Sequence, residues 1–149
     1  MEKNSFIKII KGKSSGSING QLNHFNSFDF KRIKRFYHIY LPRKNLIRAF
    51  HGHMVEEKYI YVVRGSLLLC IVKLENSKNP YKKARVRKIV LHSNSPKIVC
   101  IPKCSANGIE SLSSNTDVIF FSTLMLKESL NDDFRFPYDY WGKNVWKIK

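Results

Sequence analysis

The amino-acid sequence predicts an all-β protein, folded as a sandwich or a closed barrel of short strands. β-Branched and aromatic residues gather in short runs, which turn residues such as Gly, Pro, Asn and Ser separate at regular intervals. No stretch has the spacing of apolar residues that a long amphipathic helix requires. A chain of 149 residues, 43% of them hydrophobic, fits a single domain with a core of its own.

The strands are expected in the middle of the chain, within a barrel over residues 27–127. An N-terminal arm, residues 1–26, is rich in Gly, Ser and Asn in its second half, which is typical of a loop with at most one short strand. Turns that contain proline separate several of the strands. The expected strands cover residues 29–40, 46–53, 58–63, 66–75, 84–91, 97–101 and 116–126.

These predictions follow from the residue types in each run. Residues 29–40 mix basic side chains with aromatic and β-branched ones, which favours a strand. Residues 66–75 and 116–126 are apolar and rich in β-branched residues, as expected for buried strands. Residues 84–91 alternate basic and apolar side chains, which indicates a strand with one exposed face. Residues 97–101 form a short apolar run that a proline ends.

The C-terminal segment, residues 128–149, differs from the barrel because aromatic residues are dense in it, just after two adjacent aspartates. Pro137 rules out one continuous strand through this cluster. We expect an ordered loop that packs on the barrel, either over its opening or against a partner subunit. A lid over a substrate and plain hydrophobic capping are equally open roles.

The net charge is strongly positive, with 27 basic and 11 acidic residues giving +16 at pH 7. Such a charge attracts polyanions. The basic residues are spread along the chain, however, and no helix-turn-helix or zinc-finger pattern accompanies them. The sequence therefore argues against specific recognition of nucleic acid and favours a phosphorylated small molecule as the ligand.

Several features predict a cytoplasmic protein without a membrane segment. The longest apolar run, residues 66–72, is far too short to span a bilayer. The first residues lack the apolar segment of a secretory signal. Cys70, Cys100 and Cys104 are an odd number without a Cys-x-x-Cys pair, so we expect free thiols in a reducing compartment.

Two histidines, His51 and His53, lie two residues apart on a predicted strand and therefore point to the same face. Arg48 precedes them, and Lys58 and Arg64 follow on the next predicted strand. Imidazoles beside cations can hold a metal ion, or they can take a proton from a carbon acid and stabilise the resulting enolate. The residues alone leave both chemistries open.

Residues 33–65 resemble the sugar-nucleotide branch of the cupin superfamily. Residues 48–53, Arg-Ala-Phe-His-Gly-His, are similar to the Arg-Gly-x-His-x-His segment of dTDP-4-keto-6-deoxyglucose 3,4-ketoisomerases. Residues 58–65 and 101–108 resemble segments of dTDP-4-keto-rhamnose 3,5-epimerases. The resemblance extends over about residues 27–127. It implies a jelly-roll barrel, a homodimer, and an epimerase or isomerase of a nucleotide-linked 4-keto-6-deoxy sugar in deoxysugar and surface polysaccharide biosynthesis.

The resemblance also implies roles for polar residues. A 4-keto sugar loses a proton from C3 or C5 to a base, and a positive group stabilises the enolate oxygen. His51 matches the position of the family base. His53 could assist it, orient it or simply fill the barrel, and Lys58 or Arg48 could hold the enolate oxygen or a phosphate. The residues expected to act in catalysis are therefore His51, His53 and Lys58. Those expected to bind the substrate are Arg48, Arg64, Tyr37, Asn107 and Tyr138.

The sequence departs from the epimerase pattern at two positions. The family tyrosine that acts as an acid opposite the base is missing, since residues 122–127 contain no tyrosine, and the second family histidine corresponds to Asn107. Three alternatives follow. The chain is a 3,4-ketoisomerase, an epimerase with another acid such as Tyr37, Tyr138 or Tyr140, or a sugar-binding cupin without catalysis.

A metal-dependent cupin is a further alternative, because His51, His53 and Glu57 could supply three ligands. The later histidine of the metal-binding pattern corresponds to Asn107, and an amide is a poor ligand for the metals that imidazole sites favour. The basic residues nearby would also repel a cation. We therefore predict that the protein needs no metal and no other cofactor.

Overall fold

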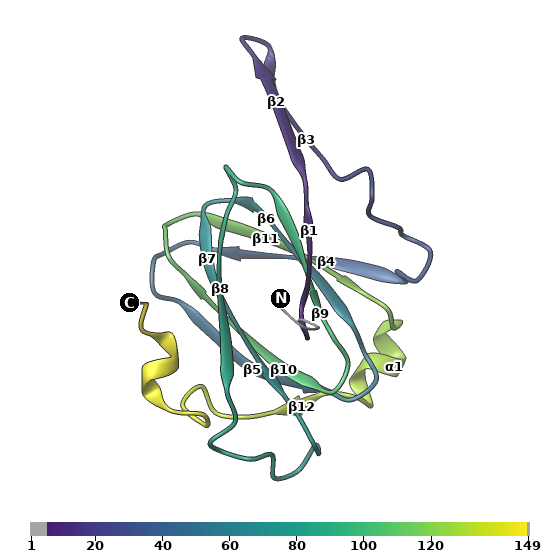
Figure 1. The fold of residues 1–149 in the computed structure, drawn as a ribbon, viewed down its shortest axis with the longest axis vertical. Helices are drawn as coiled ribbons and strands as arrows, with labels where there is room; N and C mark the ends of the chain where they lie inside the picture. Colours follow the sequence, from purple (N-terminus) through teal and green to yellow (C-terminus); the bar gives the residue numbers. More distant parts are fainter. Residues whose placement is uncertain (1–5, 149) are drawn as a thin grey trace, which may run out of the picture.

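The computed structural model describes residues 6–148 and consists mainly of two five-stranded antiparallel sheets packed face to face (Figure 1). The strands of the first sheet are, in spatial order, β1 (Lys8–Lys11), β9 (Lys97–Ile101), β6 (Lys58–Arg64), β11 (Thr116–Ser122) and β4 (Arg35–Leu41). Those of the second are β12 (Phe134–Arg135), β5 (Ile47–His53), β10 (Ser105–Ser111), β7 (Ser66–Lys73) and β8 (Val86–His92). The prediction of an all-β jelly-roll fold is confirmed.

The main core lies between the two sheets and is filled by alternate side chains of their strands. In β7, Leu67, Leu69 and Ile71 point into this core, whereas Leu68 and Cys70 belong to a second cluster under the C-terminal tail. Both faces of β7 are therefore buried, which explains why its sequence is apolar without alternation.

The aromatic part of the C-terminal tail, residues 136–146, packs on the outer face of the second sheet. Phe50 of β5 contacts Trp141 and Trp146, with ring centroids 4.8 and 5.4 Å apart. The indole of Trp141 donates a hydrogen bond to the carbonyl of Tyr81 at 3.1 Å. A 3₁₀ helix (Lys143–Trp146) carries the second indole. These aromatic rings therefore cover hydrophobic surface and do not form a lid.

The sequence predictions miss β1, β10 and β12 and extend β11 too far. β10 carries buried polar residues, among them Ser105 and Asn107, so its composition hides a central strand from a hydrophobicity pattern. β11 ends at Ser122, and a short helix, α1 (Leu126–Leu130), follows. In the part of the chain that the structure describes, no helix is long and apolar enough to cross a membrane.

The N-terminal arm contains more strand than predicted, as a hairpin of β2 (Lys13–Ser17) and β3 (Gly20–His24). The hairpin extends away from the two sheets (Figure 1). Ile18 in its turn is fully exposed, and Leu22 on β3 is mostly exposed. Apolar side chains of the hairpin therefore face solvent in a single chain.

Gly108 of β10 is expected to tolerate no larger residue, because a Cβ atom there would lie 2.5 Å from the Cβ of Ala49 and 2.8 Å from the ring of Trp146. Overpacking of this kind costs about 1–3 kcal/mol. We expect Gly108→Ala to lower the midpoint of thermal unfolding and to change the tryptophan fluorescence. Gly16→Ala is the control, since its Cβ would meet nothing closer than 3.6 Å. Equal midpoints for the two variants would contradict the packing described.

Candidate active site

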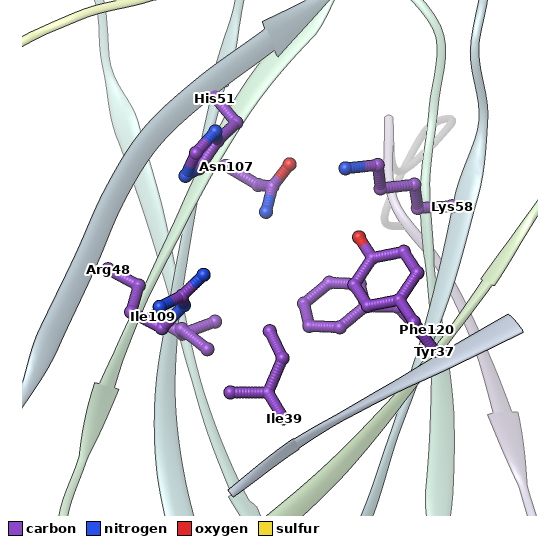
Figure 2. Close-up of a pocket in the computed structure, with 8 residues that line it drawn as sticks. All are labelled: Tyr37, Ile39, Arg48, His51, Lys58, Asn107, Ile109 and Phe120. Carbon is purple, nitrogen blue, oxygen red and sulfur yellow. The ribbon is translucent and has the colours of Figure 1, made fainter. Parts of the chain in front are cut away.

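A cavity between the two sheets is lined by side chains from both (Figure 2). The second sheet supplies Arg48 and His51 from β5 and Asn107 from β10. The first sheet supplies Tyr37 from β4 and Lys58 from β6. The remaining lining is apolar and comes from Ile39, Ile109 and Phe120. The fold thus brings together most of the polar residues that the sequence singles out.

A β-bulge in β5 turns both Arg48 and His51 toward the cavity. Residues three apart on a regular strand point to opposite faces. Here Asn107 and Ile109, which are two apart on β10, pair with His51 and Arg48, which are three apart on β5. One extra residue of β5 is therefore accommodated, and the alternation is reset. The sequence pattern gives no sign of this bulge, although it is what makes Arg48 available to the site.

His51 is uncharged at neutral pH and can act as a base. Burial lowers its pKa from 6.5 to about 4, and the positive charges of Lys58 and Arg135 add to this shift. The carboxylate of Asp133 opposes the shift, and its Oδ1 lies 3.8 Å from Nδ1 of His51. The surroundings therefore keep the ring neutral while one carboxylate stays close to it.

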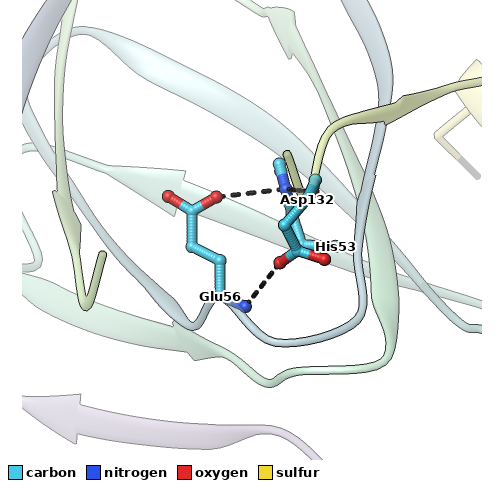
Figure 3. Close-up of side chains that lie close together, drawn as sticks. All are labelled: His53, Glu56 and Asp132. Carbon is cyan, nitrogen blue, oxygen red and sulfur yellow. Dashed lines mark hydrogen bonds and ion pairs between the residues drawn. The ribbon is translucent and has the colours of Figure 1, made fainter. Parts of the chain in front are cut away.

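His53 lies in a recess that adjoins the cavity, since His51 and Lys58 line both. Its side chain is only 5% exposed. Nδ1 lies 2.7 Å from the backbone carbonyl oxygen of Asp132 and 3.1 Å from Oε2 of Glu56 (Figure 3). Nε2 is buried and has no hydrogen-bond partner among the described residues. Burial, and after it the charge of Lys58, lowers the pKa of His53.

Glu56 is a fully buried carboxylate surrounded by hydrogen-bond donors. Its Oε1 accepts hydrogen bonds from the guanidinium of Arg35 at 3.3 Å and from the hydroxyl of Ser122. Its Oε2 accepts one from the hydroxyl of Ser129 at 3.0 Å. The positive charge of Arg35 offsets part of the cost of burying the carboxylate. Ser122, in the segment that lacks the expected tyrosine, is thus engaged with Glu56.

Asp132 connects the turn between β5 and β6 to the segment that follows α1. Its carboxylate accepts hydrogen bonds from three successive backbone amides, those of Met54, Val55 and Glu56, at 2.8, 3.0 and 2.7 Å. Because its carbonyl oxygen also meets Nδ1 of His53, this one residue holds both the turn and the imidazole ring in place.

The ligands expected for a metal-dependent cupin, His51, His53 and Glu57, do not form a cluster among the described residues, and Glu57 forms an ion pair with Arg32 at 2.7 Å. The one cluster of this kind among the described residues is His53, Glu56 and Asp132, whose possible ligand atoms lie within 4.8 Å of one another. Backbone amides and a guanidinium already bind its carboxylates. Protein donors therefore satisfy the two carboxylates, whereas Nε2 of His53 has no partner among the described residues. The absence of a metal requirement stays a prediction.

Three residues that the sequence suggests for substrate binding or acid catalysis, one arginine and two tyrosines, lie outside the cavity. Arg64, at the end of β6, is mostly exposed and forms an ion pair with Asp117 at 3.3 Å. A register shift between β6 and β11 interrupts the alternation and accounts for this outward position. Tyr138 is exposed, and the hydroxyl of Tyr140 donates a hydrogen bond to the carbonyl of Pro80 at 2.8 Å. The structure therefore does not place Arg64, Tyr138 or Tyr140 in the cavity.

Sequence reasoning misses the charged residues around the two histidines. An acidic pair ahead of the aromatic tail reaches His51 only because β12 pairs with β5, with Arg135 opposite His51. Arg35 could be found from strand alternation, since it lies two residues before Tyr37 on β4. The missed residues are Arg35, Glu56, Asp132, Asp133 and Arg135.

Comparison with known proteins gives one family and one fold. The family model described as dTDP-4-dehydrorhamnose 3,5-epimerase matches residues 21–135. A dTDP-4-dehydrorhamnose 3,5-epimerase from Sulfolobus tokodaii superposes with a TM-score of 0.77 at 23% sequence identity, over 99% of this chain and 85% of that one. Such an epimerase from Bacillus anthracis superposes with a TM-score of 0.74 at 19% identity, over 90% of this chain and 80% of that one. A 3,4-ketoisomerase from Helicobacter canadensis superposes with a TM-score of 0.69 at 18% identity, over 93% of this chain and 96% of that one. No curated protein sequence matches the chain.

Proposed function

Because the chain belongs to the dTDP-4-dehydrorhamnose 3,5-epimerase family, we propose that it inverts C3 of a dTDP-linked 4-keto-6-deoxy sugar, with His51 as the base and Tyr37 as the acid. Family membership confirms the sequence-based expectation of an isomerase-class enzyme, a dTDP-sugar epimerase or ketoisomerase. The choice of reaction and the roles of the residues are proposals that rest on the cavity.

The ketone at C4 makes the C3 proton acidic, because its loss gives an enolate delocalised onto the C4 oxygen. The neutral imidazole of His51 can take this proton. Lys58 or Arg48 can hold the enolate oxygen, since a positive charge in a shielded cavity stabilises a developing anion. The Oδ1 atom of Asn107 is buried without a partner among the described residues, so it can accept a hydrogen bond from a sugar hydroxyl.

The single observation that carries the proposal is that His51 and Tyr37 lie on opposite walls of the cavity (Figure 2). β5 belongs to the second sheet and β4 to the first. Inversion requires a proton to leave one face of the sugar ring and another to arrive at the opposite face. A ring bound between the two walls meets a base on one face and an acid on the other. Tyr37 would thus take the part of the tyrosine that is missing after β11.

A 3,4-ketoisomerase is the second candidate, and the position of His53 favours it. His51 and His53 both line the recess beside the cavity, so two proton carriers stand on the same wall. Ketoisomerisation moves protons between C3, C4 and their oxygens. It needs no acid on the opposite face of the ring.

Incubation with dTDP-4-keto-6-deoxyglucose in deuterium oxide, followed by NMR, separates these reactions. Deuterium at C3 with inversion there supports the proposal. A 3-keto product with deuterium at C4 identifies a ketoisomerase, and inversion at both C3 and C5 identifies a 3,5-epimerase. Binding of the dTDP sugar without any exchange identifies a sugar-binding protein and overturns the proposal.

The nucleotide is expected to bind through cations that line the cavity, and the Bacillus anthracis epimerase was solved with TDP bound. Arg48→Ala should raise the Kd for dTDP by about 10- to 100-fold, the value of a charge-assisted hydrogen bond or two. Calorimetric titration measures this, and added salt should weaken binding in the parent protein. Arg64→Ala is the control, because Arg64 lies outside the cavity. Parental affinity in Arg48→Ala would contradict the expected role.

We also propose a homodimer, because the outer face of the first sheet exposes aromatic side chains. Phe36 and Tyr40 of β4 are 68% and 50% exposed, and Phe30, which like Phe36 contacts Phe121, is 59% exposed. Exposed apolar patches of this kind are typical of protein–protein interfaces. Light scattering that finds only monomers would contradict this proposal.

We place the enzyme in the cytoplasm, where it would supply a deoxysugar for a surface polysaccharide. All three cysteines are free thiols, which fits a reducing compartment. Localisation of the tagged protein by cell fractionation tests this placement, and recovery outside the cytoplasmic fraction would overturn it.

A further inference from the structure

We propose that Glu56 is a positioning residue. It holds His53 with its hydrogen on Nδ1 and a free electron pair on Nε2, so that His53 serves the cavity as a second proton-carrying group. This inference rests on the second candidate under the proposed function, the 3,4-ketoisomerase, because it has His53 move a proton between neighbouring atoms of the sugar. The inference gives a part in the reaction to a buried network of charged and hydroxyl groups behind His53, beside the residues that line the cavity.

The hydrogen on Nδ1 of His53 follows from the two atoms that Nδ1 faces. One is the carbonyl oxygen of Asp132 at 2.7 Å, and the other is Oε2 of Glu56 at 3.1 Å (Figure 3). A carbonyl and a carboxylate accept hydrogen bonds and cannot donate them. Only a ring with Nδ1–H satisfies both, and a neutral ring of this kind carries its electron pair on Nε2.

The Nε2 atom of His53 is the part of the ring left without a partner. It is buried and makes no hydrogen bond among the described residues. Its ring lines the recess that shares His51 and Lys58 with the main cavity. Buried polar atoms are nearly always hydrogen-bonded in native proteins. A proton of the bound sugar would supply the missing partner.

The carboxylate of Glu56 is fixed by donors from three different elements. Arg35 comes from β4, Ser122 from β11 and Ser129 from α1. Together with His53 they engage both oxygens, so the carboxylate cannot turn away without breaking several hydrogen bonds. A well-packed apolar side chain would fill such a space with less desolvation cost. We therefore explain the buried negative charge of Glu56 by its effect on the imidazole of His53, whose hydrogen it holds on Nδ1.

This arrangement lets His53 carry a proton through a catalytic cycle. When Nε2 takes a proton from the sugar, a C–H or O–H bond breaks, an N–H bond forms and the ring becomes an imidazolium. The negative charge of Glu56 then offsets the positive charges of the ring and of Lys58. The proton returns to the sugar at a neighbouring atom, which restores the neutral ring with Nδ1–H. No further reactant is needed.

Glu56→Gln, compared with Glu57→Gln, tests the inference in the full-length enzyme. Glu57 is the matched control because it is the next residue and pairs with Arg32. We expect Glu56→Gln to lower kcat at least about 10-fold with a much smaller change in KM, since the buried carboxylate partner of a catalytic histidine can contribute as much as ~10⁴-fold. Equal kcat in the two glutamine variants would overturn the inference.

The pH profile separates positioning from simple structural support. Burial and the charge of Lys58 lower the pKa of His53, whereas Glu56 and Asp132 raise it. Loss of the charge of Glu56 therefore lowers this pKa further. In the parent enzyme, kcat should decrease at low pH as His53 becomes protonated. In Glu56→Gln this decrease should occur at a lower pH. Lost activity with the decrease at an unchanged pH would indicate a structural role and count against the inference.

A measurement on the unmodified protein decides the matter if Glu56→Gln fails to fold. Nitrogen NMR of histidine-labelled protein near pH 7, with His53→Gln for assignment, reports which ring nitrogen carries the hydrogen. Nδ1–H supports the inference, and Nε2–H overturns it. The tautomer does not depend on turnover, so it remains a test even if no sugar exchanges deuterium and the proposed function fails.

Discussion

Replacing His51 with asparagine is expected to slow deuterium incorporation at C3 by about 10²- to 10⁴-fold, the range that a positioned base contributes. The imidazole lies in the cavity with Arg48 and Lys58, and an amide cannot accept the C3 proton at neutral pH. Binding of dTDP should persist, because the cations remain. NMR measures the exchange, and calorimetric titration measures the binding.

The same base gives an expected pH dependence. Burial lowers the pKa of His51 to about 4, so its contribution to the rate should stay constant from about pH 5 to 8 and fall as the pH drops through about 4. In the unfolded chain the pKa is 6.5, so the unfolded state binds more protons between these values. The free energy of unfolding should therefore decrease as the pH falls from 6.5 toward 4.

His38→Asn is the control for the deuterium exchange experiment with His51→Asn. His38 lies on β4, is half exposed and pairs with Asp117 at 2.7 Å, so its loss should leave the exchange rate unchanged. If His51→Asn exchanges deuterium at the parental rate, another residue removes the proton and the role assigned to His51 is wrong.

Tyr37→Phe is expected to slow inversion at C3 by at least about 10²-fold while deuterium still enters at C3. Without the phenol, a proton that His51 removes can only be returned to the same face of the ring. Phenylalanine preserves the stacking on Phe120, where the rings lie 5.3 Å apart with an interplanar angle of 9°. Proton coupling constants at C3 report the configuration, and the isotope content reports the exchange.

Tyr61→Phe is the matched control for Tyr37→Phe. Tyr61 lies on the outer face of the first sheet, where it contacts Phe25 at 5.0 Å between ring centroids, so inversion should proceed at the parental rate. Parental inversion in Tyr37→Phe as well would identify another acid. Loss of exchange together with inversion would assign Tyr37 a role in binding the sugar instead.

Strand positions are largely predictable here because alternation is a local property of the chain. The prediction for residues 97–101 coincides with β9, and the one for residues 58–63 ends one residue before the end of β6. The sequence does not predict β10, because two of its residues fit the cavity and the C-terminal tail rather than a hydrophobic pattern. Asn107 lines the cavity, and Gly108 leaves room for an indole of the tail. Neither contributes to a hydrophobic pattern.

The candidate site is only partly predictable, because bulges and distant segments complete it. The spacing of His51 and His53 places them together, whereas Arg48 depends on a bulge that no residue type announces. Glu56 and Glu57 are adjacent glutamates, and the sequence alone does not distinguish between them. The turn that Asp132 holds decides which of them meets the histidine. Such a choice is made by residues far away in the chain, which local patterns cannot encode.

The hydrogen bonds of Asp132 also link the geometry of the site to the order in which the chain is made. β4 to β11 all precede Asp132 in the chain, so these strands can begin to pair while the ribosome is still working. The turn after β5 and the ring of His53 are held only once Asp132 has emerged. Until Asp132 has been made, a nascent chain therefore contains both histidines but lacks the residue whose carbonyl oxygen orients His53.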